Sequence, residues 1–91
     1  MNALIQEYSE YLKIEKRHSP HTVESYCRDL RRFARAFPDF KAASFKTAQI
    51  RDFLLTLRNE GLSASSIARC LSSIKSFFRY LCDDNQLNQN P

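Results

Sequence analysis

The sequence predicts an all-α domain in which four helices form two antiparallel hairpins. Apolar residues recur every three or four positions along four separate segments, which is the repeat of a helix with one buried face. The chain has one glycine and three prolines, too few for the many turns of a strand-rich fold. Its 91 residues can enclose a single core. Short connections between the segments favour antiparallel packing of neighbours.

The first half of the chain contains two of these segments. Residues 2–16 form the first predicted helix, with an apolar face and an outer face that contains three glutamates. The second has Ser19 as N-cap and Pro20 at its first helical position, and Pro38 prevents it from passing Phe37. Its apolar side is expected to contain Val23, Tyr26, Cys27, Leu30, Phe33, Ala34 and Phe37.

The second half begins with a short loop, residues 39–46, whose two phenylalanines should turn inward. Thr47 is the predicted cap of the third helix, and Gly61 is its predicted left-handed stop, with Leu62 packing back. Ser63 caps the fourth helix, which is expected to end near Cys82 and to bury Ile67, Leu71, Ile74, Phe78 and Leu81. We expect residues 1–84 to be one domain and residues 85–91 to begin a linker.

Composition excludes several classes of function. There is no apolar run long enough to span a membrane, no signal peptide is expected, and no Gly-rich phosphate loop or metal-binding motif is found. Three cysteines without paired spacing indicate small buried residues in a reducing cytoplasm. His18 and His21 have no nucleophile at a suggestive spacing. We therefore expect no catalytic residue, metal, cofactor or small-molecule substrate in this chain.

Basic residues and serines gather on the outer faces of the second and fourth helices. The net charge is +4 and the sequence pI about 9.2. A helical wheel groups His21, Ser25, Arg28, Arg32 and Arg35, with Arg31 on the flank. In the fourth helix it groups Ser65, Arg69, Ser72 and Ser76, flanked by Ser73, Lys75, Arg79 and Tyr80. Short hydroxyl side chains between basic ones allow a helix close to a phosphate backbone. A merely solvated face is the alternative for both helices.

Two stretches resemble tyrosine recombinases and phage integrases, most of all the Xer-type recombinases. SPHTVESYCRDL (residues 19–30), followed by Phe33, resembles the family's second helix. GLSASSIARCLSSIKSFFRYL (residues 61–81) resembles the fourth, usually G-x-S-x-x-T-I-x-R-x-L-S-A-I-R-x-F-x-x-x-L. The Asn90-Pro91 pair fits the junction with a catalytic domain. The resemblance covers nearly the whole chain.

This resemblance implies a SAM-like core-binding domain that grips a recombination half-site in double-stranded DNA. It implies that Thr22 and Ser66 contact phosphate, and that Ser25, Ser65 and Arg69 approach base edges or nearby backbone. Arg28, Arg31, Arg32, Lys75 and Ser76 would line the same surface. The family's catalytic residues would lie in a following domain, so this fragment would not be an enzyme. Other recombinase protomers are the second implied partner, for which Glu7 and Glu10 are our candidate surface.

The sequence is also compatible with one alternative interpretation. A helical SAM-like module can serve protein–protein association, in which case the basic faces would only be solvated and the domain would not bind DNA. A titration with DNA separates the two.

Overall fold

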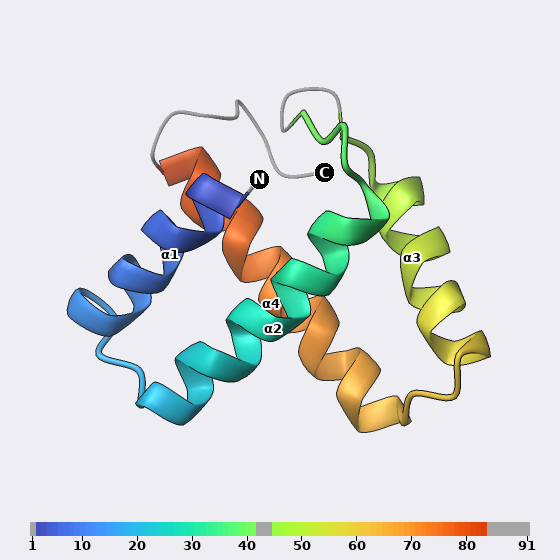
Figure 1. Cartoon of the computed structure of the whole chain (residues 1–91), viewed down its shortest axis with the longest axis horizontal. Helices are drawn as coiled ribbons and strands as arrows, with labels where there is room; N and C mark the ends of the chain where they lie inside the picture. Colours follow the sequence, from blue (N-terminus) through green and yellow to red (C-terminus); the bar gives the residue numbers. More distant parts are fainter. Residues whose placement is uncertain (1, 42–44, 84–91) are drawn as a thin grey trace.

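The computed structural model describes residues 2–41 and 45–83, which form four helices and no strand. The helices are α1 (Asn2–Ile14), α2 (Pro20–Ala36), α3 (Thr47–Asn59) and α4 (Ala64–Asp83). α1 packs on α2 and α3 packs on α4, so each consecutive pair is a hairpin, and α2 crosses α4 at the centre (Figure 1). The all-α prediction is confirmed. The domain is only 18 Å thick along its shortest axis, about two helix diameters.

The helix ends follow the sequence signals, with one exception. The hydroxyls of Ser19 and Ser63 accept hydrogen bonds from the backbone N–H groups of the residues three positions on, as N-caps do. Gly61 has φ +92°, and the N–H of Leu62 donates to the carbonyl of Leu57, which completes a Schellman ending. Thr47, however, is the first helical residue of α3 rather than its cap; Lys46 occupies the cap position.

Phe33 lies at the centre of the core, where α2, the α2–α3 connection, α3 and α4 meet. Its ring contacts those of Phe37, Phe40, Phe45, Phe53 and Phe78, mostly edge to face. Such rings bury a large apolar area and add a geometric preference of their own. The two loop phenylalanines turn inward as predicted, Phe45 more fully than Phe40.

The buried face of α4 is rotated from the predicted one. Ile67 and Leu71 are only half-buried, whereas Cys70, Ser73 and Phe77 are completely buried. The buried face must serve three neighbours, because α4 lies between α1, α2 and α3, and this widens it beyond a single apolar stripe. Part of that wider face is polar, so a pattern based on apolar residues alone places the centre of the face incorrectly.

Two of the three cysteines are buried thiols, as the sequence indicated. Cys27 and Cys70 lie in the core, and burial raises the pKa of both, that of Cys70 to about 11. Cys82 is half-buried. The predicted linker, residues 85–91, lies outside the described residues.

Candidate nucleic-acid interface

The amino-terminal ends of α2 and α4 lie at the same edge of the molecule, and the two helices run from there to their crossing (Figure 1). Each end has the same local sequence logic. Ser19 and Ser63 are the caps, and their hydroxyls also donate to Thr22 Oγ1 and Ser66 Oγ, each in the first turn. A helix amino terminus has unpaired N–H groups and the positive end of the helix dipole. The positive ends of two helix dipoles therefore lie at one edge of the domain, which favours anions there.

The net charge of the chain lies entirely in these two helices. α2 has four arginines against Glu24 and Asp29, and α4 has three basic residues against Asp83, so each helix contributes +2 to the total of +4. The rest of the chain has seven basic and seven acidic residues, which cancel. The basic excess is thus concentrated on α2 and α4.

The outward face of α2 is more basic than its composition suggests. His21, Arg28 and Arg31 are exposed, and Arg32 is half-buried on the side of α4. Glu24 forms a surface ion pair with Arg28 at 3.3 Å. Such exposed i,i+4 pairs contribute only about 0.3–0.5 kcal/mol to stability, so Arg28 can leave Glu24 and bind another anion at little cost.

The outward face of α4 contains a smaller set of candidates than the sequence indicated. Ser65, Ser72 and Lys75 are exposed, and so is Arg79. Ser76 is half-buried, because its Oγ accepts a 2.6 Å hydrogen bond from the hydroxyl of Tyr8 on α1. Ser76 thus joins α4 to α1.

A polar cluster fills the crossing of α2 and α4. Arg69 donates from Nε to Asp29 Oδ2 at 2.9 Å and from Nη2 to Asp29 Oδ1 at 3.0 Å, a bidentate ion pair. The Ser73 hydroxyl lies 3.3 Å from Asp29 Oδ2 and 3.0 Å from the Arg69 carbonyl, and its one proton serves one of them at a time. The Asp29 carboxylate raises the pKa of Arg69 through these hydrogen bonds. The Asp29 side chain is 1% exposed and that of Arg69 39%.

Two candidate residues do not lie on the outer surface. Ser25 and Ser73 are buried, with 8% and 0% of their surfaces exposed, so the expectation that both face outward is wrong. Ser73 lies where α4 meets α2, since its hydroxyl is within hydrogen-bond distance of Asp29. The acidic Asp29 of α2 is likewise buried. DNA contact by the remaining candidates stays a prediction.

The sequence contains a signal for this crossing that apolar patterns miss. Polar residues recur at helical spacing beside each apolar face: Thr22, Ser25, Asp29 and Arg32 in α2, and Ser66, Arg69, Ser73 and Ser76 in α4. The two series have the same three, four, three spacing, and the ion pair joins their central members. Asp29 is the residue of functional interest that the sequence analysis missed.

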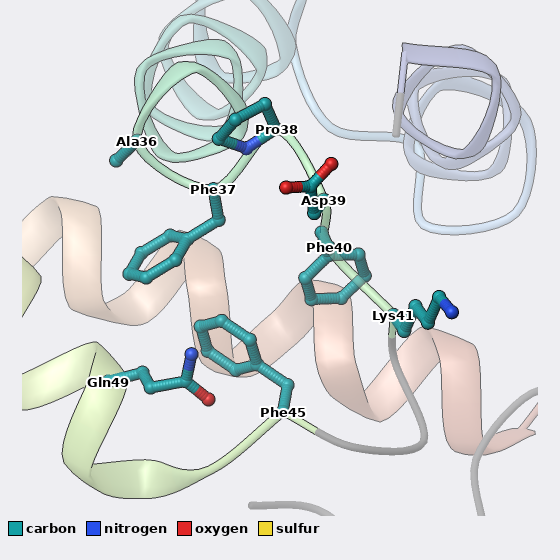
Figure 2. A pocket seen from close by; sticks show the side chains of 8 residues that line it. All are labelled: Ala36, Phe37, Pro38, Asp39, Phe40, Lys41, Phe45 and Gln49. Carbon is teal, nitrogen blue, oxygen red and sulfur yellow. The ribbon is translucent and has the colours of Figure 1, made fainter.

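Two hollows elsewhere are weaker candidates. The pocket in Figure 2 has a volume of about 230 Å³, and three phenylalanine rings from the α2–α3 connection form its wall. That is below the roughly 300–1,000 Å³ of usual small-molecule sites. The hollow between α2 and α3 is larger, about 460 Å³, but its lining combines Arg32 and Arg35 of α2 with Asp52 of α3 and Glu60, the C-cap of α3. In each hollow the acidic and basic lining residues are equal in number, whereas α2 and α4 have an excess of basic residues.

In the part of the chain that the structure describes, no three His, Cys, Asp or Glu side chains gather as a metal site would require. In the same residues, none of the helices combines the length and the apolar character needed to cross a membrane.

Comparison with known proteins decides the family. Residues 5–85 match the sequence model of the phage integrase N-terminal SAM-like domain. The chain belongs to this family. Membership confirms the resemblance drawn from the second and fourth helices.

Relatives of this integrase domain are considerably longer than the chain itself. It is 37% identical over 86 residues to the tyrosine recombinase XerC of Halalkalibacterium halodurans, covering 89% of this chain and 28% of that protein. It is 35% identical over 95 residues to the tyrosine recombinase XerD of Listeria monocytogenes serotype 4b, covering 100% and 32%. With XerC of Shigella flexneri serotype 5b, identity is 33% over 90 residues, covering 96% and 30%. The integrase domain thus spans about 30% of each relative's length. No solved structure matches it.

Proposed function

We propose that this domain binds double-stranded DNA through α2 and α4 and positions a tyrosine recombinase on its half-site without cutting DNA itself. The observation that supports the proposal most is the concentration of the whole net charge in these two helices. Family membership supplies the context, because the relatives are named as recombinases.

The chemistry of the exposed side chains suits a phosphate backbone. Arg28, Arg31 and Lys75 provide mobile positive charges, and each phosphate they neutralise releases condensed counterions from the DNA. Ser65 and Ser72 keep the face of α4 thin and offer hydroxyl donors to phosphate or base edges. Thr22 and Ser66 lie in the first turns, where their hydroxyls accept hydrogen bonds from the cap serines and can donate their own protons to a phosphate.

Binding by this domain alone should be weak. One face of one small domain neutralises few phosphates, so we expect a Kd in the range of about 10⁻⁴–10⁻⁶ M on arbitrary sequence at physiological salt. The proposal needs no metal or nucleotide cofactor, and it places the protein with its DNA, which in bacteria is in the cytoplasm. Nanomolar binding by the domain alone would contradict the single-face geometry.

A matched pair of variants tests the proposal. Arg31→Gln with Lys75→Gln removes one exposed charge from α2 and one from α4. Lys13→Gln with Arg51→Gln removes the same two residue types from exposed positions on α1 and α3. Affinity for a short DNA duplex is measured by fluorescence anisotropy over a range of salt concentrations.

We expect the first variant to flatten the log–log salt dependence by about two units, close to 0.9 per lost phosphate contact, and the second to leave it nearly unchanged. Equal effects would mean that only total charge matters. Amide NMR of the unmodified chain adds an independent readout: shifts confined to α2 and α4 support the proposal, whereas no shift at low salt favours the protein-association module.

A second surface is proposed for contact between recombinase protomers. Glu7 and Glu10 are exposed on α1, on the side away from the core. Their charge disfavours DNA and suits a basic protein surface. Glu7→Lys with Glu10→Lys should then reduce the loading of a second protomer on a duplex with two half-sites more than that of the first. Equal loss at both steps would assign α1 to the fold alone.

A further inference from the structure

The cluster at the α2–α4 crossing has a property that the outer surface lacks, which is fixed orientation. Arg69 is the one basic residue of α4 that is joined to α2, and the bidentate pair with Asp29 allows its guanidinium a single plane. Exposed arginines such as Arg31 have no comparable restraint among the described residues. A guanidinium held in one plane loses little conformational freedom when it binds a further anion.

Arg69 has capacity left for such an anion. A guanidinium has five N–H donors, and the pair with Asp29 uses only the Nε proton and one proton of Nη2. The other three make no hydrogen bond to the residues that the structure describes. With 39% of its side chain exposed, Arg69 is accessible from outside, whereas its partner at 1% is not.

A second basic side chain, that of Arg32, lies near Arg69. Arg32 is close enough to α4 that its charge, together with that of Arg69, opposes the raised pKa of Cys70, which burial causes in the first place. An anion at the outer edge of Arg69 would therefore meet positive charge from both helices, while the Asp29 carboxylate is buried.

We propose that Asp29 is a positioning residue for DNA binding: its buried carboxylate fixes the crossing of α2 and α4 and holds Arg69 so that the outer edge of the guanidinium receives a backbone phosphate. This inference rests on the proposed function and deepens it. Asp29 itself does not touch DNA. Ser73 helps to hold Asp29 in place, because its hydroxyl can donate a further hydrogen bond to the carboxylate.

A double-mutant cycle on the 91-residue chain separates positioning from a purely structural role. Asp29→Asn, Arg69→Ala and the double variant are each checked for folding by amide NMR and then titrated with the same short mixed-sequence duplex. We expect Asp29→Asn to weaken binding about threefold to tenfold when Arg69 is present, the effect of losing about one phosphate contact. In the Arg69→Ala background the same change should weaken nothing, because no guanidinium remains to be positioned.

Arg69→Lys keeps the inference testable if Asp29→Asn fails to fold. Lysine retains the charge beside Asp29 but lacks the planar fork, so we expect a folded protein with an unchanged salt dependence and a similar loss of affinity. Equal weakening by Asp29→Asn in both backgrounds, or full affinity in Arg69→Lys, would overturn the positioning role while leaving DNA binding by α2 and α4 intact. Absence of any duplex binding by the unmodified chain would instead overturn the proposed function, and this inference with it.

Discussion

Tyr8 should make the stability of this domain fall at alkaline pH, and Tyr8→Phe should remove that fall. The Tyr8 side chain has no exposed surface, and its ring packs against those of Phe77, Tyr11 and Tyr80. Burial raises its pKa from 10.0 to about 12, although the hydrogen bond with Ser76 acts in the opposite direction. Phenylalanine keeps the packed ring and cannot ionise.

The sign of the effect follows from the raised pKa. The unfolded chain loses the tyrosine proton first, so stability is unaffected below about pH 10 and falls as pH rises toward 12. Two pKa units correspond to about 2.7 kcal/mol as the limit well above pH 12, and to about 1.4 kcal/mol at pH 11. That is a substantial share of the roughly 5–14 kcal/mol expected for a chain of this length.

The two proteins should therefore exchange their order of stability. At neutral pH the unmodified chain has the additional hydrogen bond from Tyr8 to Ser76, which contributes about 0.5–1.5 kcal/mol. Near pH 11 the stability lost because Tyr8 ionises in the unfolded chain equals the stability gained from this hydrogen bond. Above that pH Tyr8→Phe should be the more stable protein. Other titrating groups, including the Cys70 thiol, are present in both and cancel in the difference.

Urea unfolding followed by far-UV circular dichroism at several pH values from 7 to 11.5 measures this difference directly. Ser76→Ala is the control, since it removes the hydrogen bond but leaves the ionisable hydroxyl, so its stability should still fall with pH. Parallel curves for the unmodified chain and Tyr8→Phe over the whole range would refute the reasoning, because the buried hydroxyl would then titrate as it does in the unfolded chain.

Three further substitutions or treatments test other parts of the fold. Gly61→Ala should lower the free energy of unfolding by about 1 kcal/mol, because φ is +92° and no atom lies within 4 Å of the added Cβ; a loss above about 3 kcal/mol in urea unfolding would indicate an unrecognised clash. Phe33→Ala should cost about 3–5 kcal/mol by the same measurement, and a cost under 1 kcal/mol would exclude Phe33 as the centre of the core. Cys27 and Cys70 should react with a thiol reagent at neutral pH only after denaturation, since both are buried and their pKa values are raised; rapid labelling of the native protein would contradict their burial.

The fold could be predicted because its signals are local. Ser19 with Pro20, Gly61 with Leu62, and Ser63 each specify a helix end through backbone hydrogen bonds within a few residues, and the structure contains those bonds. The apolar repeat then defines the inner face of the first three helices, whereas the centre of the buried face of α4 lies closer to Cys70, Ser73 and Phe77. The prediction that Thr47 caps α3 is wrong because Lys46, a residue that is rarely an N-cap, occupies the cap position before it.

The surface at the crossing could not be predicted in the same way. A helical wheel divides each helix into an apolar and a polar side, so it predicts that Ser25 and Ser73 face outward. Whether a polar residue faces water or another polar helix depends on the partner, and the pairing of Asp29 with Arg69 spans 40 residues. Recognising it requires the angle at which the two hairpins cross, which no local pattern contains.

The pairing of Asp29 with Arg69 also restricts how this sequence can change over generations. Replacement of Arg69 alone leaves a carboxylate buried without a counter-charge, and such losses cost about 3–5 kcal/mol when both partners are buried, somewhat less here because Arg69 reaches solvent. Two apolar residues of similar volume could replace the pair together at little cost. The route between these solutions passes through a less stable intermediate, so we expect descendants of this domain to retain both residues or to have exchanged both.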